Sequence, residues 1–174
     1  MDRDAYRMNQ ASVIYQAFHL FPLLTVLENV MFPMQLQHVS KKEAKARAQE
    51  FLGKVGLPDS LYGKMPNMIS GGKQQRVAIA RAMASGGQIL LADEPTGNLD
   101  SKSSRAVIAA FEQAKAELEA TIFMVTHDSF AASFCDRVII LRDGVVWQAL
   151  ERGDTERQAF QDQLLDAIRE MGRE

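Results

Sequence analysis

The chain has 174 residues, of which 47% are hydrophobic and 24% are charged, and its formal net charge is -2. This composition is ordinary for a globular domain, and the near-neutral charge excludes nucleic acid as the default partner. The apolar runs are far shorter than the roughly 20 residues that cross a bilayer, and no signal peptide is recognisable, so we expect a protein that stays in the cytoplasm. Cys135 is the only cysteine, which rules out an internal disulfide.

The first part of the chain predicts a short strand, a loop and a helix. Alternation and β-branching indicate a strand over residues 11–15, and mixed polarity indicates a loop up to about residue 24. A helix toward Gln37 is expected to begin at Thr25, with Glu28 at its third position. Pro33 is expected to disturb or end it.

Two longer helices follow. Ser40 is the expected cap of a helix over 41–55, whose apolar stripe consists of Ala44, Ala48, Phe51, Leu52 and Val55. The next helix begins at Ser70 and runs to about Ala84. It is expected to turn Val77, Ile79, Ala80 and Met83 inward and Gln74, Arg76 and Arg81 outward or toward a partner.

Two apolar runs then predict buried strands joined by a helix. Residues 88–92 have the pattern of a strand buried on both faces of a parallel sheet, and residues 121–126 have that of a second buried strand. The helix between them is capped by Asp100 or Ser101 and extends to about Glu119. A hairpin turned on Asp-Gly over 137–149 and an amphipathic helix over 155–170 complete an α/β chain.

The sequence Ser70-Gly71-Gly72 at a helix start is physically suited to bind an anion. Glycines allow close approach of the backbone, and free N–H groups and the helix dipole face outward. The competing interpretation is a simple N-cap with a flexible turn, and for these three residues alone that interpretation is favoured. The surrounding motifs reverse this preference.

Asp93 and Glu94 follow a buried strand, at the edge where open α/β sheets bind ligands. One carboxylate there can hold a Mg²⁺ shell while its neighbour orients or deprotonates a water, as phosphoryl transfer to water requires. A solvated strand end is an equally good interpretation of the pair alone. His127, at the end of the next strand, is able to donate a hydrogen bond to a γ-phosphate.

Together these pieces resemble the nucleotide-binding domain of ATP-binding cassette (ABC) transporters. Residues 69–76, Ile-Ser-Gly-Gly-Lys-Gln-Gln-Arg, resemble the family's signature, and residues 90–96 resemble its Walker B strand. Asn98-Leu99-Asp100 resembles the D-loop, and the sequence around His127 resembles the switch histidine. Gln16, before Phe18-His19-Leu20-Phe21-Pro22, matches the Q-loop.

The resemblance implies the cofactors ATP and Mg²⁺ and a role for each matching residue. Asp93 and Gln16 would serve the metal, Gln16 would also sense the transmembrane partner, and Glu94 would be the general base. His127 would contact the γ-phosphate, and Asp100 would lie at the dimer seam. Ser70, Gly71, Gly72 and Lys73 would face ATP held by the opposite protomer, although Lys73 stands where the family usually has glutamine.

The resemblance also implies the fold and the domain organisation. We expect a single incomplete ABC domain of the P-loop NTPase (RecA-like) class, with a helical signature subdomain over about 25–85, a core over 86–150 and a C-terminal helix over 151–174. The phosphate loop Gly-x-x-x-x-Gly-Lys-Ser/Thr does not occur among the 174 residues. We therefore expect a truncated domain that lacks an N-terminal strand, that loop and an antiparallel subdomain, and that is inactive alone.

The implied function is that of the ATP-binding and ATP-hydrolysing subunit of a transporter, peripheral on the inner face of the membrane. Its partners would be a transmembrane permease subunit and a second nucleotide-binding subunit, in a homodimer or heterodimer. The residues around Asp100 and His127 look most like the bacitracin-type peptide exporters, near the lipoprotein-releasing and macrolide-exporting groups. The alternative is a non-hydrolytic subunit that supplies its signature to a complete partner ATPase.

Overall fold

A computed structural model describes residues 11–173, which form two compact units. The first unit comprises residues 11–125 and the second residues 126–173. Each is described by itself. The subdomain boundaries expected from the sequence stay a prediction.

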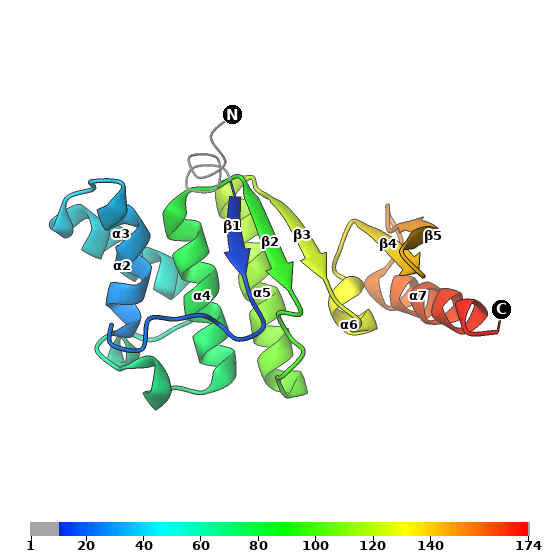
Figure 1. The fold of residues 1–174 in the computed structure, drawn as a ribbon, viewed down its shortest axis with the longest axis horizontal. Helices are drawn as coiled ribbons and strands as arrows, with labels where there is room; N and C mark the ends of the chain where they lie inside the picture. The colour runs from blue at the N-terminus through cyan, green and yellow to red at the C-terminus, as the bar shows by residue number, and fades with distance from the viewer. Residues whose placement is uncertain (1–10, 174) are drawn as a thin grey trace. The chain divides into compact units, whose positions relative to one another are not determined.

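A parallel sheet of three strands organises the first unit (Figure 1). The strands β1 (Ala11–Ile14), β2 (Ile89–Asp93) and β3 (Thr121–Val125) lie in the order β1-β2-β3. Ala11 pairs with Ile89, and Ile89 pairs with Thr121. The carboxyl ends of all three strands therefore lie at one edge, and the α/β class predicted from the sequence is confirmed.

Two helices cover one face of this sheet: α4 (Gly71–Ser85) and α5 (Ser101–Leu118). Helix α4 is the centre of the unit, because its apolar residues are buried on nearly every side. Both helices begin at the end of the sheet where the strands finish, as Figure 1 shows. This arrangement brings two helix N-termini to the same edge as Asp93 and Glu94.

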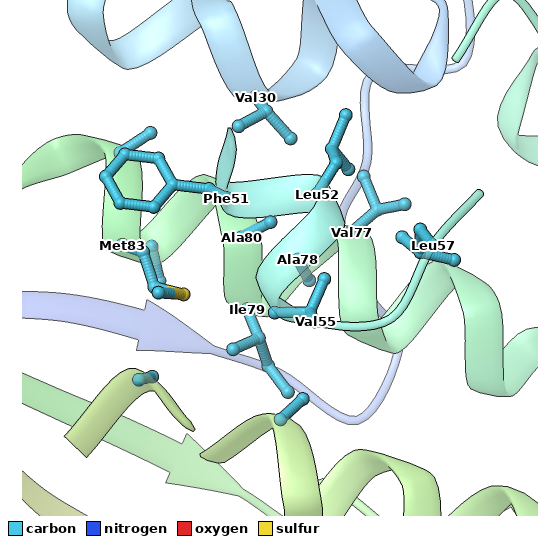
Figure 2. Packing of buried hydrophobic residues seen from close by; sticks show 14 of the residues in the cluster. Val30, Phe51, Leu52, Val55, Leu57, Val77, Ala78, Ile79, Ala80 and Met83 are labelled. Carbon is cyan, nitrogen blue, oxygen red and sulfur yellow. The ribbon is translucent and has the colours of Figure 1, made fainter. Parts of the chain in front are cut away.

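A second layer of helices packs on the far side of α4. Helix α2 (Val26–Leu36) begins with a complete capping box between Thr25 and Glu28, and α3 (Lys41–Lys54) begins at Ser40, whose hydroxyl accepts from the N–H of Glu43. Figure 2 shows side chains of these helices and of the turn after α3 meeting those of α4: Val30, Phe51, Leu52, Val55, Leu57, Val77, Ala80 and Met83. The caps and apolar stripe predicted from the sequence are confirmed here.

Helix α2 continues through Pro33 to Leu36, so the proline does not end the helix. Two further expectations are wrong. In β2, Leu90 and Ala92 are buried while Leu91 is 37% exposed, and the side chains of β3 are half-buried or exposed, so neither strand is buried on both faces. Arg76 and Arg81 do not point out to solvent: both guanidinium groups bind carbonyl oxygens of their own chain.

The second unit contains a short helix, a hairpin and a long helix. Helix α6 (Ser129–Ala132) is followed by β4 (Arg137–Arg142) and β5 (Val145–Glu151), which pair antiparallel around Asp143 and Gly144. Both turn residues have positive φ, 51° and 81°, as a two-residue hairpin turn requires. Helix α7 (Arg157–Met171) buries Phe160, Leu164 and Ala167, whereas Ile168 is 40% exposed.

Candidate functional site

Gln16 and Glu94 flank the same glycine at the carboxyl edge of the sheet. A Cβ placed on Gly97 would lie 3.0 Å from Gln16 Nε2 and 3.6 Å from Glu94 Cβ. Glu94 itself has a φ of 44°, and its N–H donates to Val125 O in the adjoining strand at 2.8 Å. The turn after β2 thus brings the predicted Q-loop glutamine beside the predicted base.

The starts of α4 and α5 also touch. A Cβ on Gly72 would lie only 2.7 Å from Ser103 Cβ, so glycine is required by this contact. Ser103 is held in turn by Asp100, which accepts its hydroxyl at 2.7 Å and its N–H at 2.9 Å. The predicted signature turn and the predicted D-loop aspartate are therefore neighbours in the structure.

Ser70 occupies the N-cap position of α4, and its side chain makes no capping hydrogen bond. The residue is exposed, Gly71 is half-buried, and the carbonyl of Ser70 accepts from the N–H groups of Lys73 and Gln74. The first N–H groups of a helix have no partner within the helix. This helix start is therefore chemically suited to an anion, as the sequence predicted.

The loop between β1 and α2 contacts the signature turn. Phe18 and His19 have positive φ values of 60° and 46°, which are unfavourable for residues with a side chain. The Phe18 ring lies against Gly71, where a Cβ would be 3.3 Å from Phe18 Cζ. Arg81 binds the turn from the other side through hydrogen bonds to His19 O at 2.6 Å and Phe18 O at 3.2 Å.

A groove of about 330 Å³ opens beside this loop. Its walls come from β1, from the loop, and from α2 and α4, and they include His19, Phe21, Pro33, Leu36 and Arg81. The Phe21 ring packs on Phe32 at 4.6 Å between centroids and lies 5.8 Å from the Arg81 guanidinium carbon. The lining mixes apolar side chains with polar ones and the Arg81 cation, which suits an amphipathic segment.

His127, the predicted switch histidine, lies in the second unit and is exposed. Directly after it, Asp128 caps α6 by accepting from the N–H of Phe130 at 2.9 Å. Arg157 of α7 stacks against the rings of Phe130 and Phe134, 5.6 and 4.9 Å from their centroids. His127 is thus followed by a short helix that α7 holds in place.

The residues at the carboxyl edge of the sheet fit a Mg²⁺ ion that the protein holds through few side chains. Asp93 is exposed at the end of β2, and Gln16 provides an amide one strand away. Among residues 11–173 no cluster of three or more histidine, cysteine or acidic side chains forms a metal cage. A Mg²⁺ held by one carboxylate and by nucleotide oxygens needs no such cage, so the residues present fit it.

Sequence reasoning did not identify four residues that shape this site: Phe18, Arg81, Gly97 and Ser103. Each acts through a contact with a residue far along the chain, and no local pattern distinguishes it. Of these four residues only Gly97 carried a signal in the sequence, because a glycine in a turn often marks the close approach of another part of the chain. The roles predicted for the nine candidate residues, from Gln16 to His127, stay predictions.

The fold is an α/β fold in which a glycine-rich helix start and two acidic residues lie at the carboxyl edge of a parallel sheet. The family profile described as ABC transporter matches residues 2–97. The chain therefore belongs to the ABC transporter family.

Three relatives illustrate the similarity. The bacitracin export ATP-binding protein BceA of Halalkalibacterium halodurans is 40% identical over 155 residues, which cover 89% of this chain and 61% of BceA. The macrolide export ATP-binding/permease protein MacB 2 of Aeromonas hydrophila is 45% identical over 140 residues, covering 80% of this chain and 21% of that protein. The dimeric ATP-binding cassette MJ0796, in a post-hydrolysis state bound to ADP and Pi, has a TM-score of 0.76 and 39% identity, covering 87% of this chain and 68% of that one.

The chain spans less than two thirds of the length of BceA. Within residues 11–173, no helix is both long and apolar enough to cross a membrane.

Proposed function

We propose that the chain contributes the signature turn, the Walker B acids and the D-loop of an ATP-binding transporter subunit. The observation that carries the proposal is the contact of Gly72 with Ser103, which fixes the Ser70–Gly72 helix start next to Asp100. Two helix N-termini and two carboxylates at one sheet edge form the electrostatic setting that a Mg²⁺-nucleotide needs.

The residues divide this work as follows. Asp93 and Gln16 hold Mg²⁺, Glu94 orients or deprotonates the attacking water, and His127 contacts the γ-phosphate. Ser70, Gly71, Gly72 and Lys73 face the ATP of a second nucleotide-binding subunit, and Asp100 lies at the seam between the two. The dimeric state of the MJ0796 cassette supports a paired arrangement.

The second partner is a transmembrane permease subunit, which places the protein on the cytoplasmic face of the membrane. The groove between β1, α2 and α4 supports this role, because its apolar and polar side chains offer a permease helix a surface to bind. The combined ATP-binding and permease name of MacB 2 supports the same pairing. The cargo class is a peptide antibiotic, lipoprotein or macrolide, exported as the names of BceA and MacB 2 suggest.

A complementation assay tests the composite site. The chain is mixed with a full-length relative that has the phosphate loop but whose own signature serine is replaced by arginine. We expect ATP turnover only in the mixture, because Ser70 completes the relative's site. Ser70→Arg in this chain should lower that turnover by roughly a hundredfold, whereas Ser60→Arg, at an exposed serine in a short 3-10 turn, should not.

Two results would contradict the proposal. One is turnover of the mixture that survives Ser70→Arg, which would mean that the signature turn faces no nucleotide. The other is robust turnover by the 174 residues alone that is lost in Glu94→Gln, since we expect no hydrolysis without the phosphate loop.

A further inference from the structure

Arg81 stands between the groove and the signature turn. It lines the groove on one side, and on the other its guanidinium binds two consecutive carbonyl oxygens, those of Phe18 and His19. The bond to His19 O, at 2.6 Å, is short for an N–H donor. Burial lowers the pKa of Arg81 below its ordinary value.

The turn that Arg81 binds is strained. Phe18 and His19 are consecutive residues with side chains in the left-handed region. Such conformations cost of order 1–3 kcal/mol each and persist only where surrounding contacts hold them. Within the turn itself, the Phe18 N–H donates to Tyr15 O at 3.2 Å and the His19 N–H donates to Ala17 O at 2.6 Å.

The strain has a geometric result at the signature turn. In this conformation the Phe18 ring reaches Gly71, and Leu99 lies on the same side, 3.4 Å from where a Cβ of Gly71 would be. The ring therefore closes one side of the Ser70–Gly72 helix start. A relaxed turn would carry the ring elsewhere, because side-chain direction follows the backbone dihedrals.

We propose that Arg81 is a positioning residue for the nucleotide site, which holds the Phe18–His19 turn so that Phe18 stays packed on Gly71. The relevance of this contact to ATP binding rests on the function proposed above, whereas the contact itself can be tested without nucleotide. The same guanidinium faces the groove, so it is the contact through which a bound permease helix would reach the Ser70–Gly72 turn.

Helix α4 offers a matched control. Arg76 also donates to two carbonyl oxygens of its own chain, Val55 O at 3.1 Å and Gly56 O at 2.8 Å. Gly56 itself has a φ of 72°. Arg76 also makes a longer bond to Gly72 O at 3.4 Å. Methionine at either position keeps an unbranched apolar stem and removes every donor.

The test uses the 174-residue chain and nuclear magnetic resonance. In Arg81→Met we expect amide exchange at Phe18 and His19 to rise by about tenfold or more, because two charge-assisted bonds are lost. The Gly71 Cα–H resonances should also lose the shift caused by the Phe18 ring current. Arg76→Met should raise exchange around Val55–Leu57 and leave Phe18 and His19 unchanged.

Two further variants separate the steps. Phe18→Leu should remove the ring-current shift at Gly71 while Arg81 still protects the turn, and Arg81→Lys should restore only part of the protection, since an ammonium lacks the planar fork. These variants carry the test if Arg81→Met does not fold.

Equal exchange patterns in the two methionine variants would overturn the proposal. So would an unmoved Gly71 resonance in a variant whose turn has opened. A positive result here combined with a failed complementation assay would keep the Arg81 contact and reject the proposed function, so the two failures are distinguishable.

Discussion

Gly71 and Gly72 show why the structural role of a short motif can be predicted only in part from the sequence. The sequence predicts that Ser-Gly-Gly opens a helix and can face an anion, because this follows from the backbone alone. The structure adds a second requirement, since a side chain on Gly72 would meet Ser103 and one on Gly71 would meet Phe18. Both neighbours are distant in sequence, so no local pattern predicts these contacts.

Gly72→Ala should destabilise the fold by about 1–3 kcal/mol, because its Cβ would lie 2.7 Å from Ser103 Cβ. Urea unfolding followed by circular dichroism measures the loss. Gly63→Ala is the matched control, since no atom lies within 4 Å of its would-be Cβ, and its effect should stay within about 0.5 kcal/mol. Ser103→Gly removes the obstructing Cβ, so Gly72→Ala should cost much less stability in the Ser103→Gly background than in the wild type. An equal cost in both backgrounds would reject the steric explanation.

Helix starts are the elements that the sequence predicts best. Thr25, Ser40 and Asp100 each precede a helix and accept from an N–H of its first turn, because capping depends on residues two or three positions apart. Burial of the strands on both faces was not predictable in the same way. An apolar run such as Ile89–Ala92 indicates that a strand is suited to a core, but it does not indicate which helices cover the strand.

The Asp100 cap makes a pH prediction at this scale. Hydrogen bonds from the Ser103 hydroxyl, then from the N–H groups of Ser103 and Lys102, hold the pKa of Asp100 below its ordinary value of 3.8. A carboxylate with a depressed pKa in the folded state contributes stability above its unfolded pKa, and this is lost as the pH falls through the folded value.

We therefore expect the melting temperature of the wild type to fall toward that of Asp100→Asn as the pH is lowered through 3.8 and below, while at pH 7 the wild type melts higher. Calorimetry across this range measures both. Asp162→Asn removes the same charge from α7, where the carboxylate accepts one long bond of 3.4 Å from Gln158. A wild type that keeps its full advantage over Asp100→Asn well below pH 3.8 would contradict the cap.

At the scale of the whole first unit, the sheet has one covered and one uncovered face. Leu90 and Ala92 of β2 are buried against the helices, whereas Leu91 is 37% exposed, and Phe123 and Val125 of β3 are 59% and 53% exposed. Adjacent apolar side chains on two paired strands form the kind of patch that marks an interaction surface.

This face should make the 174-residue chain self-associate. Phe123→Thr with Val125→Thr should shift the chain toward monomer in analytical ultracentrifugation without lowering its melting temperature, because both positions suit a polar β-forming residue. Leu90→Thr is the contrasting variant on the covered face, and it should cost more than about 2 kcal/mol of stability. An unchanged association state in the double variant would mean that the uncovered face is not the contact.

The pairing of Ala11 with Ile89 has a consequence for how the chain folds. Every helix from α2 to α4 lies between these two strands in sequence, so β1 can join the sheet only after a long loop has closed. Contacts within the helical layers are far more local, and local contacts form faster. The helices should therefore form the folding nucleus. Strand β1 and the Q-loop that follows it in sequence should be among the last parts to dock.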